Sequence, residues 1–176
     1  VKLFHANPSV ERARSAILEK FQHTQQALQV SLHLLHNGNE SDYVSSFAAH
    51  TIVQKVQSGT VPSSQEFSNS LLSMIAKYGV STKHASITKM LCQAYVDYVL
   101  MNYSEVGGST LGSQIAPLPP HCIVVIYTLL PEEARSPKLF PKGSKRAELY
   151  NSVIADHSES AIDAIQKAGV SRESLQ

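Results

Sequence analysis

The sequence predicts an all-α fold, and within that class an α-solenoid, which is a stack of antiparallel helix pairs. Apolar residues recur at three- and four-residue steps along most of the 176 residues, and no segment has a convincing strand pattern. Helices of the same kind begin about forty residues apart, which is the period of HEAT and armadillo arrays. Because one helix pair cannot bury its apolar face alone, such pairs stack on their neighbours. A closed helix bundle is the alternative all-α architecture.

Residues 43–57 form the helix around which this prediction is organised. One stripe at helical spacing is apolar or carries long aliphatic stems, and it consists of Val44, Phe47, Ala48, Thr51, Ile52 and Lys55. The other faces hold Ser45, Ser46, His50, Val53, Gln54 and Gln57. Because Ala48 and Ala49 are small, a neighbouring helix can come close. We therefore expect a helix that packs on two sides and leaves one polar face open.

Capping residues mark the helices before this one. Ser9 can cap a helix over residues 9–22, and Glu11 lies in the first turn, where the helix dipole favours a carboxylate. Thr24 is expected to cap the next helix, which Gly38 and its asparagine neighbours stop.

Serines open the helices that follow. Ser63 or Ser64 begins a helix that ends at Gly79, and the next helix runs over residues 82–102 after a cap at Ser81.

Two irregular stretches interrupt the second half of the chain. Residues 103–120, rich in Gly and Ser, and residues 131–143 are predicted to be loops. Between them, residues 121–130 are predicted to form a short helix that Pro131 ends, although the β-branched run CIVVIYTLL would also allow a buried strand. A last helix covers residues 144–167. Its inward side is expected to hold Leu149, Val153, Ile154, Ala161, Ile162 and Ile165.

Composition excludes several classes of protein. The net charge is +1, so the basic excess typical of nucleic-acid binders is missing. No run of apolar residues is long enough to predict a transmembrane helix. Charged residues make up 16%, and many Ser, Gln and His residues remain, which favours a surface that meets protein. The first residues, VKLFH, resemble the last turn of a helix, so we expect an excised piece that is truncated at both ends.

Few residues suggest catalysis, a metal or a cofactor, and we expect none of the three. His33 and His36 could share a metal ion, but a third ligand at sensible spacing is missing. Cys122 follows His121, yet adjacent residues on a helix point apart, which argues against a nucleophile and its base. Cys92 and Cys122 are better explained as two buried thiols in a reducing compartment.

Several segments, in the same order, resemble the karyopherin-β nuclear transport receptors of the transportin-SR and importin-thirteen branch. SSFAAHTIVQKV is similar to the family segment FFAAQTL-x-x-KI, and AL-QVSLHLL to AW-x-x-x-x-x-LL. SLLSMIAKY resembles SLL-x-x-L-x-x-Y, and MLCQAYVDY resembles QLCLALADL. The most specific match is IYTLLPEEARSPKL followed by KGSKRAEL, similar to LTVLPEEV-x-S-x-x-L and G-x-x-RR-x-E. Departures include Leu28 in place of a Trp and His50 in place of a Gln.

The resemblance implies that residues 1–176 are an amino-terminal HEAT-repeat region, with residues 1–5 as the stub of its first helix. Helices near residues 9–22, 41–58, 82–102 and 144–168 would then line the inner, concave side. In that family these inner helices bind the GTP form of the small GTPase Ran. Later repeats carry protein cargo, here possibly of the SR type, and contact nucleoporins, while the receptor shuttles between nucleus and cytoplasm. Ran binding switches the solenoid between two curved states.

The open face of residues 41–58 is the main candidate for this contact. It offers Ser46, His50, Val53, Gln54 and Gln57, and the matching face of residues 82–102 offers Lys89 and Gln93. Asp97 is expected to brace a neighbouring repeat instead of meeting a partner. Polar residues around one apolar centre suit a protein–protein contact, although a solvated face would look the same.

Two other interpretations stay open at the level of sequence. A cluster of Lys142, Lys145 and Arg146 opens the last helix and could meet an acidic partner or lie in a solvated loop. The whole chain could also be a generic HEAT-like scaffold that joins proteins without any dependence on Ran.

Overall fold

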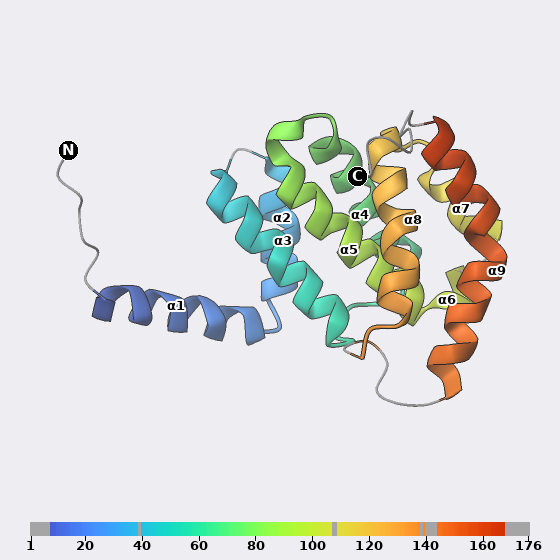
Figure 1. Ribbon diagram of the computed structural model, residues 1–176. Coiled ribbons are helices and arrows are strands. Elements are labelled where there is room, and N and C mark those ends of the chain that lie inside the picture. The colour runs from blue at the N-terminus through green and yellow to red at the C-terminus, as the bar shows by residue number, and fades with distance from the viewer. Residues whose placement is uncertain (1–7, 39, 107–108, 138, 140–143, 168–176) are drawn as a thin grey trace.

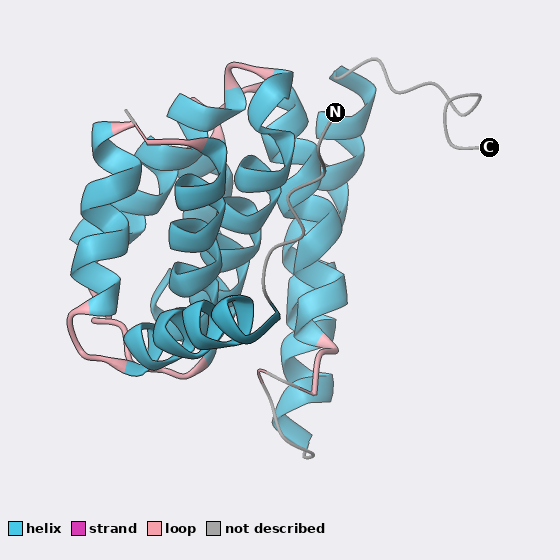
Figure 2. Ribbon diagram, turned by 90° about the vertical axis from the view of Figure 1, so that its left-hand side faces the viewer, coloured by secondary structure: helices cyan, strands magenta, loops and turns pink. Residues whose placement is uncertain are grey.

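The computed structural model describes residues 8–38, 40–106, 109–137, 139 and 144–167, and it contains helices and loops but no strand in these ranges. Its helices are α1 (Pro8–His23), α2 (Ala27–Asn37), α3 (Asp42–Gln57), α4 (Gln65–Gly79), α5 (Ala85–Met101), α6 (Tyr103–Val106), α7 (Ser109–Ile115), α8 (Pro120–Ala134) and α9 (Ser144–Lys167), with a short 3₁₀ helix, Thr82–His84, before α5 (Figure 1). The predicted all-α class is confirmed (Figure 2).

The helices stack as an α-solenoid. α3 packs on α5, α5 packs on α8, and α8 packs on α9, so these four helices run side by side. α2 packs on α3, and α4 packs on α5, which gives the two antiparallel pairs at the centre of the stack. α1 extends away from this body and touches it near its C-terminal end, where the rings of Phe21 and Phe47 lie 6.1 Å apart.

Ser64 and Ser81 are caps as predicted, but Ser9 is not, because α1 begins at Pro8 and Ser9 lies inside the helix. The Ser41 hydroxyl accepts a hydrogen bond from the Val44 N–H at the start of α3, and Ser64 does the same for Phe67 at the start of α4. Gly38 closes α2 with a φ of 66°, a left-handed conformation that suits glycine. Thr24 is not a cap either, because its hydroxyl donates to the Phe21 carbonyl of α1 and α2 begins only at Ala27.

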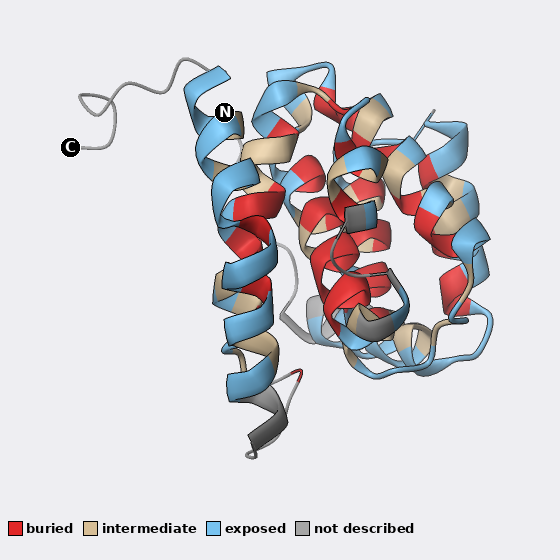
Figure 3. Ribbon diagram, turned by 90° about the vertical axis from the view of Figure 1, so that its right-hand side faces the viewer, coloured by how far each residue is buried: buried red, intermediate tan, exposed pale blue. Residues whose placement is uncertain are grey.

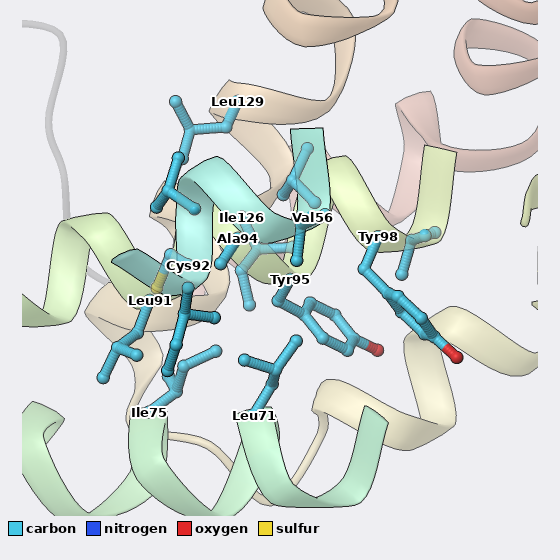
Figure 4. Close-up of a cluster of buried hydrophobic side chains, with 14 of the residues drawn as sticks. Val56, Leu71, Ile75, Leu91, Cys92, Ala94, Tyr95, Tyr98, Ile126 and Leu129 are labelled. Atoms are coloured by element: carbon cyan, nitrogen blue, oxygen red, sulfur yellow. The ribbon is translucent and has the colours of Figure 1, made fainter. Parts of the chain in front are cut away.

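The core follows the middle of the stack. Leu71 and Ile75 of α4, Leu91 and Tyr95 of α5, and Ile126 of α8 are fully buried and meet in one cluster (Figure 4). Burial then falls towards the last helix. Figure 3 shows α9 buried along the side that faces the stack and exposed along its outer side.

The predicted loop over residues 103–120 contains two short helices, α6 and α7. Leu111 and Ile115 stand one turn apart on α7 and are buried, and this single apolar pair was too short a pattern to predict a helix. Tyr95 of α5 donates a hydrogen bond to Gln114 at 2.9 Å, which ties α7 to the core.

Pro131 does not end α8, which continues to Ala134. The proline removes one backbone donor and crowds the carbonyl four residues before it. It stands in the last turn, so only Glu132, Glu133 and Ala134 follow it in the helix. The alternative of a buried strand for residues 121–130 is wrong.

The position of α8 corrects the expected order of inner helices. Residues 144–168 were expected to follow α5 in the inner row, but α8 occupies that place and α9 packs on α8. The reason is the apolar character of α8 on nearly every side, with Ile123, Val124 and Val125 half-buried opposite its core face. A helix of that kind must be covered from two directions.

The inward face of α9 also differs from the prediction. Val153 is buried, and Leu149 and Ala161 pack against the core, as expected, but Ile154, Ile162 and Ile165 are 41%, 56% and 37% exposed. The side that contacts the stack also carries Tyr150, His157 and Ala164. His157 lies on this face because it packs against two aromatic rings. The ring centroids of Tyr103 and Tyr127 each lie 6.2 Å from that of His157.

Replacement of Tyr98 by Phe should destabilise the protein by about 1–2 kcal/mol. The Tyr98 hydroxyl donates to the Ser64 carbonyl and accepts from the Ser64 N–H, each at 2.9 Å, so its loss leaves both backbone groups without that partner. Urea unfolding measures the change. Tyr43→Phe is the matched control, because Tyr43 is 72% exposed. If both substitutions change the free energy of unfolding equally, the Tyr98 hydroxyl does not stabilise the protein through Ser64.

Acid should weaken the packing of α9 through His157. Burial lowers the pKa of His157 below its usual 6.5, and Asp156 opposes this only in part. The unfolded chain therefore binds a proton at higher pH than the folded chain does. The stabilisation that neutral, buried His157 contributes is complete above pH 6.5. It is lost as pH falls through the lower pKa of His157 in the folded state. Melting temperatures at about pH 7.5 and about pH 5.5 should differ less in His157→Leu than in the wild type. His36→Leu, an exposed control, should retain the wild-type difference.

Candidate functional site

The exposed strip of α3 is the first part of the candidate surface. His50 and Gln54 are exposed, and Ser46 is half-buried, at steps of four residues that place all three on one side of the helix. The strip is polar and lies outside the contacts that α3 makes with α2 and α5.

Val53 does not belong to this strip. It is 6% exposed and joins the core, so its predicted position on the open face is wrong. α3 is covered by α2 on one side and by α5 on the other, and together they bury a wider arc than the sequence pattern indicated. The open face is therefore narrower and purely polar.

Gln57 and Asp97 form a brace between α3 and α5. The Gln57 amide donates to a carboxylate oxygen of Asp97 at 2.8 Å, and Asp97 is fully buried. Asp97 therefore braces neighbouring repeats, as expected. Gln57, half-buried, serves this contact from the edge of the candidate surface.

Gln93 makes the equivalent bond one helix further along. Its amide donates to a carboxylate oxygen of Glu133 at 3.1 Å, which joins α5 to α8. Both bonds connect residues that are 40 positions apart. A third glutamine, Gln22, reaches from α1 to Thr51 of α3 at 3.1 Å. A glutamine side chain therefore makes a hydrogen bond at each of three successive junctions: α1 to α3, α3 to α5, and α5 to α8.

Charged groups border this row. Lys89 is exposed on α5, one turn before Gln93, and Glu132 is exposed on α8 beside Glu133. The row therefore presents an amide and an imidazole on α3, one exposed basic side chain on α5 and one exposed acidic side chain on α8. Such a mixture suits the polar part of a protein–protein interface.

The sequence analysis missed the contribution of α8, meaning Glu132, Glu133 and Thr128. The inner row was expected to continue with residues 144–168, so no side chain of residues 121–130 was considered for the binding surface. The signal was nevertheless present, because Gln93 and Glu133 repeat the 40-residue offset of Gln57 and Asp97.

The basic cluster cannot join the surface by any described contact. Lys142 lies outside the described residues, and so do the side chains of Lys145 and Arg146.

The chemistry of the remaining clusters is limited. In the described ranges no group of three or more His, Cys, Asp or Glu residues could hold a metal ion. His33 instead pairs with Asn37 at 2.9 Å. Over the same ranges, none of the helices has both the length and the apolar character needed to cross a membrane.

Cys122 and His121 depart from expectation. The Cys122 sulfur lies 3.3 Å from Nε2 of His121, so the two adjacent residues do meet. They stand in the first turn of α8.

A surface cavity lies at the other end of the stack, between α7, α8 and α9. Ile115, Ile123 and Tyr127 line it, and the Lys167–Asp163 ion pair at 2.7 Å closes its rim. Its walls are mainly apolar, and it shares no residue with the inner-row surface.

No protein-family model matches the chain, and no curated protein matches it in sequence. The likeness to karyopherins therefore depends on the short ordered segments alone.

Replacement of Gln57 by Ala should cost about 1–3 kcal/mol of stability, because it removes a hydrogen bond to a buried carboxylate. Gln54→Ala, on the same helix but exposed, should change stability by less than about 0.5 kcal/mol. Urea unfolding of both variants tests the brace. If the two substitutions have the same small effect, the Gln57–Asp97 bond does not hold α3 to α5.

Proposed function

We propose that this chain is a protein-binding α-solenoid from a nuclear transport receptor, and that its inner helices bind Ran in the GTP form. The single observation that carries the proposal is where the family-like segments lie. SSFAAHTIVQKV lies on α3, MLCQAYVDY on α5 and IYTLLPEEA on α8, so the three occupy adjacent helices of one row.

The outer helices support the same correspondence. AL-QVSLHLL lies on α2 and SLLSMIAKY on α4, which are the helices that back the inner row. In the family the inner helices carry the Ran contact. Of the helices that the resemblance places on that side, α3 exposes His50 and Gln54, and α5 exposes Lys89.

The surface suits recognition by shape and hydrogen bonding. His50 and Gln54 can donate and accept, Lys89 can pair with an acidic group, and Glu132 can pair with a basic one. Surface ion pairs add little affinity but fix register and suppress wrong partners. Under this proposal, cargo and nucleoporins bind elsewhere on the parent receptor, which shuttles between nucleus and cytoplasm.

A generic protein scaffold is the second candidate. The exposed amides and imidazole of α3 need only a protein partner, and nothing in their geometry requires a nucleotide-dependent one. The two candidates differ in whether the nucleotide state of the partner matters.

The test is binding of Ran to the chain, with Ran loaded either with a non-hydrolysable GTP analogue or with GDP. We expect binding of the GTP form only. Gln54→Arg should weaken it at least about tenfold, since a bulky charge would enter the contact. Gln29→Arg is the matched control on an exposed position of α2 and should bind as the wild type does.

Equal binding of both nucleotide forms, or no binding of either, would overturn the Ran proposal and favour the generic scaffold. Equal weakening by Gln54→Arg and Gln29→Arg would remove the inner row as the contact surface.

A further inference from the structure

The surface cavity between α7, α8 and α9 is large enough to hold a small molecule. Its volume is about 410 Å³, which lies within the range of small-molecule sites in proteins. Ile115 of α7 is buried, and Ile123 of α8 and Ala164 of α9 are half-buried, so each helix gives the cavity an apolar wall. The apolar part of a ligand would leave water on entering this space, which favours binding.

The side chain of Tyr127 brings one polar group into this apolar space. Tyr127 is 7% exposed, and its ring packs against the ring of His157 with the centroids 6.2 Å apart. Its hydroxyl oxygen lies 3.6 Å from the position that a Cβ atom on Gly112 would take, and Gly112 and Tyr127 both line the cavity. No described residue forms a hydrogen bond with this hydroxyl. Because a buried tyrosine hydroxyl normally has a partner, this group is available to a ligand.

The rim of the cavity carries charges that balance each other. Among the described residues that line the cavity, Asp163 and Lys167 are the charged ones, and they form an ion pair of 2.7 Å on α9. Ser160, which is exposed, adds an uncharged hydroxyl beside them. The cavity therefore offers no net charge. An ion that entered it would exchange water for apolar walls without an opposite charge in excess, which is unfavourable.

We propose that this cavity binds a small, uncharged and mainly apolar molecule that carries one hydrogen-bonding group, such as a phenol, an alcohol or a ketone. The apolar part lies between Ile115, Ile123 and Ala164, and the hydrogen-bonding group meets the Tyr127 hydroxyl. This proposal is independent of the proposed function, because the cavity shares no residue with the inner-row surface.

Such a ligand would contact α7, α8 and α9 together. α8 packs on α9, and α7 is tied to the core by the hydrogen bond from Tyr95 to Gln114. The cavity is formed only when these helices are in place, so the ligand binds the folded chain and not the unfolded one. The melting temperature should therefore rise with the concentration of the ligand.

The first experiment compares the affinities of 2-naphthol, naphthalene and 2-naphthalenesulfonate for the wild-type chain at neutral pH, by equilibrium dialysis. These probes share one ring system and differ in a hydroxyl or a charge. We expect 2-naphthol to bind most tightly and naphthalene to bind about fivefold more weakly, because it lacks the hydrogen-bonding group. The sulfonate should bind at least about tenfold more weakly than 2-naphthol, because its charge has no counterpart in the cavity.

Each other result would contradict part of the proposal. A sulfonate that binds as tightly as 2-naphthol would mean that Lys167 recognises an anion, which overturns the uncharged class of ligand. Equal affinities for naphthalene and 2-naphthol would remove the hydrogen bond. Lack of binding of 2-naphthol would overturn the site itself.

Tyr127→Phe tests the hydrogen bond, because it removes the hydroxyl and keeps the ring. It should weaken binding of 2-naphthol about fivefold and leave binding of naphthalene unchanged. If the variant binds both probes as the wild type does, or loses affinity for both equally, the Tyr127 hydroxyl does not bind the ligand.

Ser160→Trp tests the location. Ser160 is exposed on α9, so the chain should still fold, and the indole would cover the cavity from its rim. Binding of 2-naphthol should weaken at least about tenfold. Ser152→Trp is the matched control, because Ser152 is exposed on the same helix and lies outside the cavity, and it should bind as the wild type does. Equal affinities of the two tryptophan variants would place the binding site elsewhere and overturn the proposal.

Discussion

The packing of α5 between α3 and α8 is the constraint on which the rest of the structure depends. In its second half every residue from Ala94 to Leu100 is buried, which means that this helix is covered on all sides. α4 covers it from behind, and α3 and α8 cover its flanks. A helix with no free side fixes the positions of its neighbours, and the stack grows outward from it in both directions.

Because α5 is buried on all sides, the carboxylate of Asp97 needs a hydrogen-bond donor from a neighbouring helix. A carboxylate in that position is costly unless it is hydrogen-bonded, and Gln57 of the preceding inner helix supplies a donor. Gln93 and Glu133 repeat the arrangement at the next junction with one partner less deeply buried. These bonds set the register of one inner helix on the next, which apolar packing alone would specify less sharply.

The inner row therefore combines a structural and a recognition role. Gln57 and Gln93 hold the helices together from the edge of the surface, while His50, Gln54 and Lys89 remain exposed beside them. A partner that binds across α3, α5 and α8 would contact three helices whose spacing is held by the hydrogen bonds of Gln57 and Gln93.

The sequence by itself determined the helical class, the stacking, most helix ends and the polar strip of α3. These features depend on local physics: serine caps, the glycine at 38, and apolar residues at three- and four-residue steps. It also indicated the bracing role of Asp97. It did not determine which helix packs beside α5 in the inner row. α8 is apolar on nearly every side, so its sequence pattern does not show which face packs on α5.

Only the tertiary structure decided the features that depend on distant neighbours. Val53 is buried because α2 and α5 together cover a wide arc of α3, and Ile154 is exposed because His157 and two tyrosines occupy the contact side of α9. Local spacing fixes which residues share a face of a helix, but the neighbours that cover that face are fixed by packing across the whole stack.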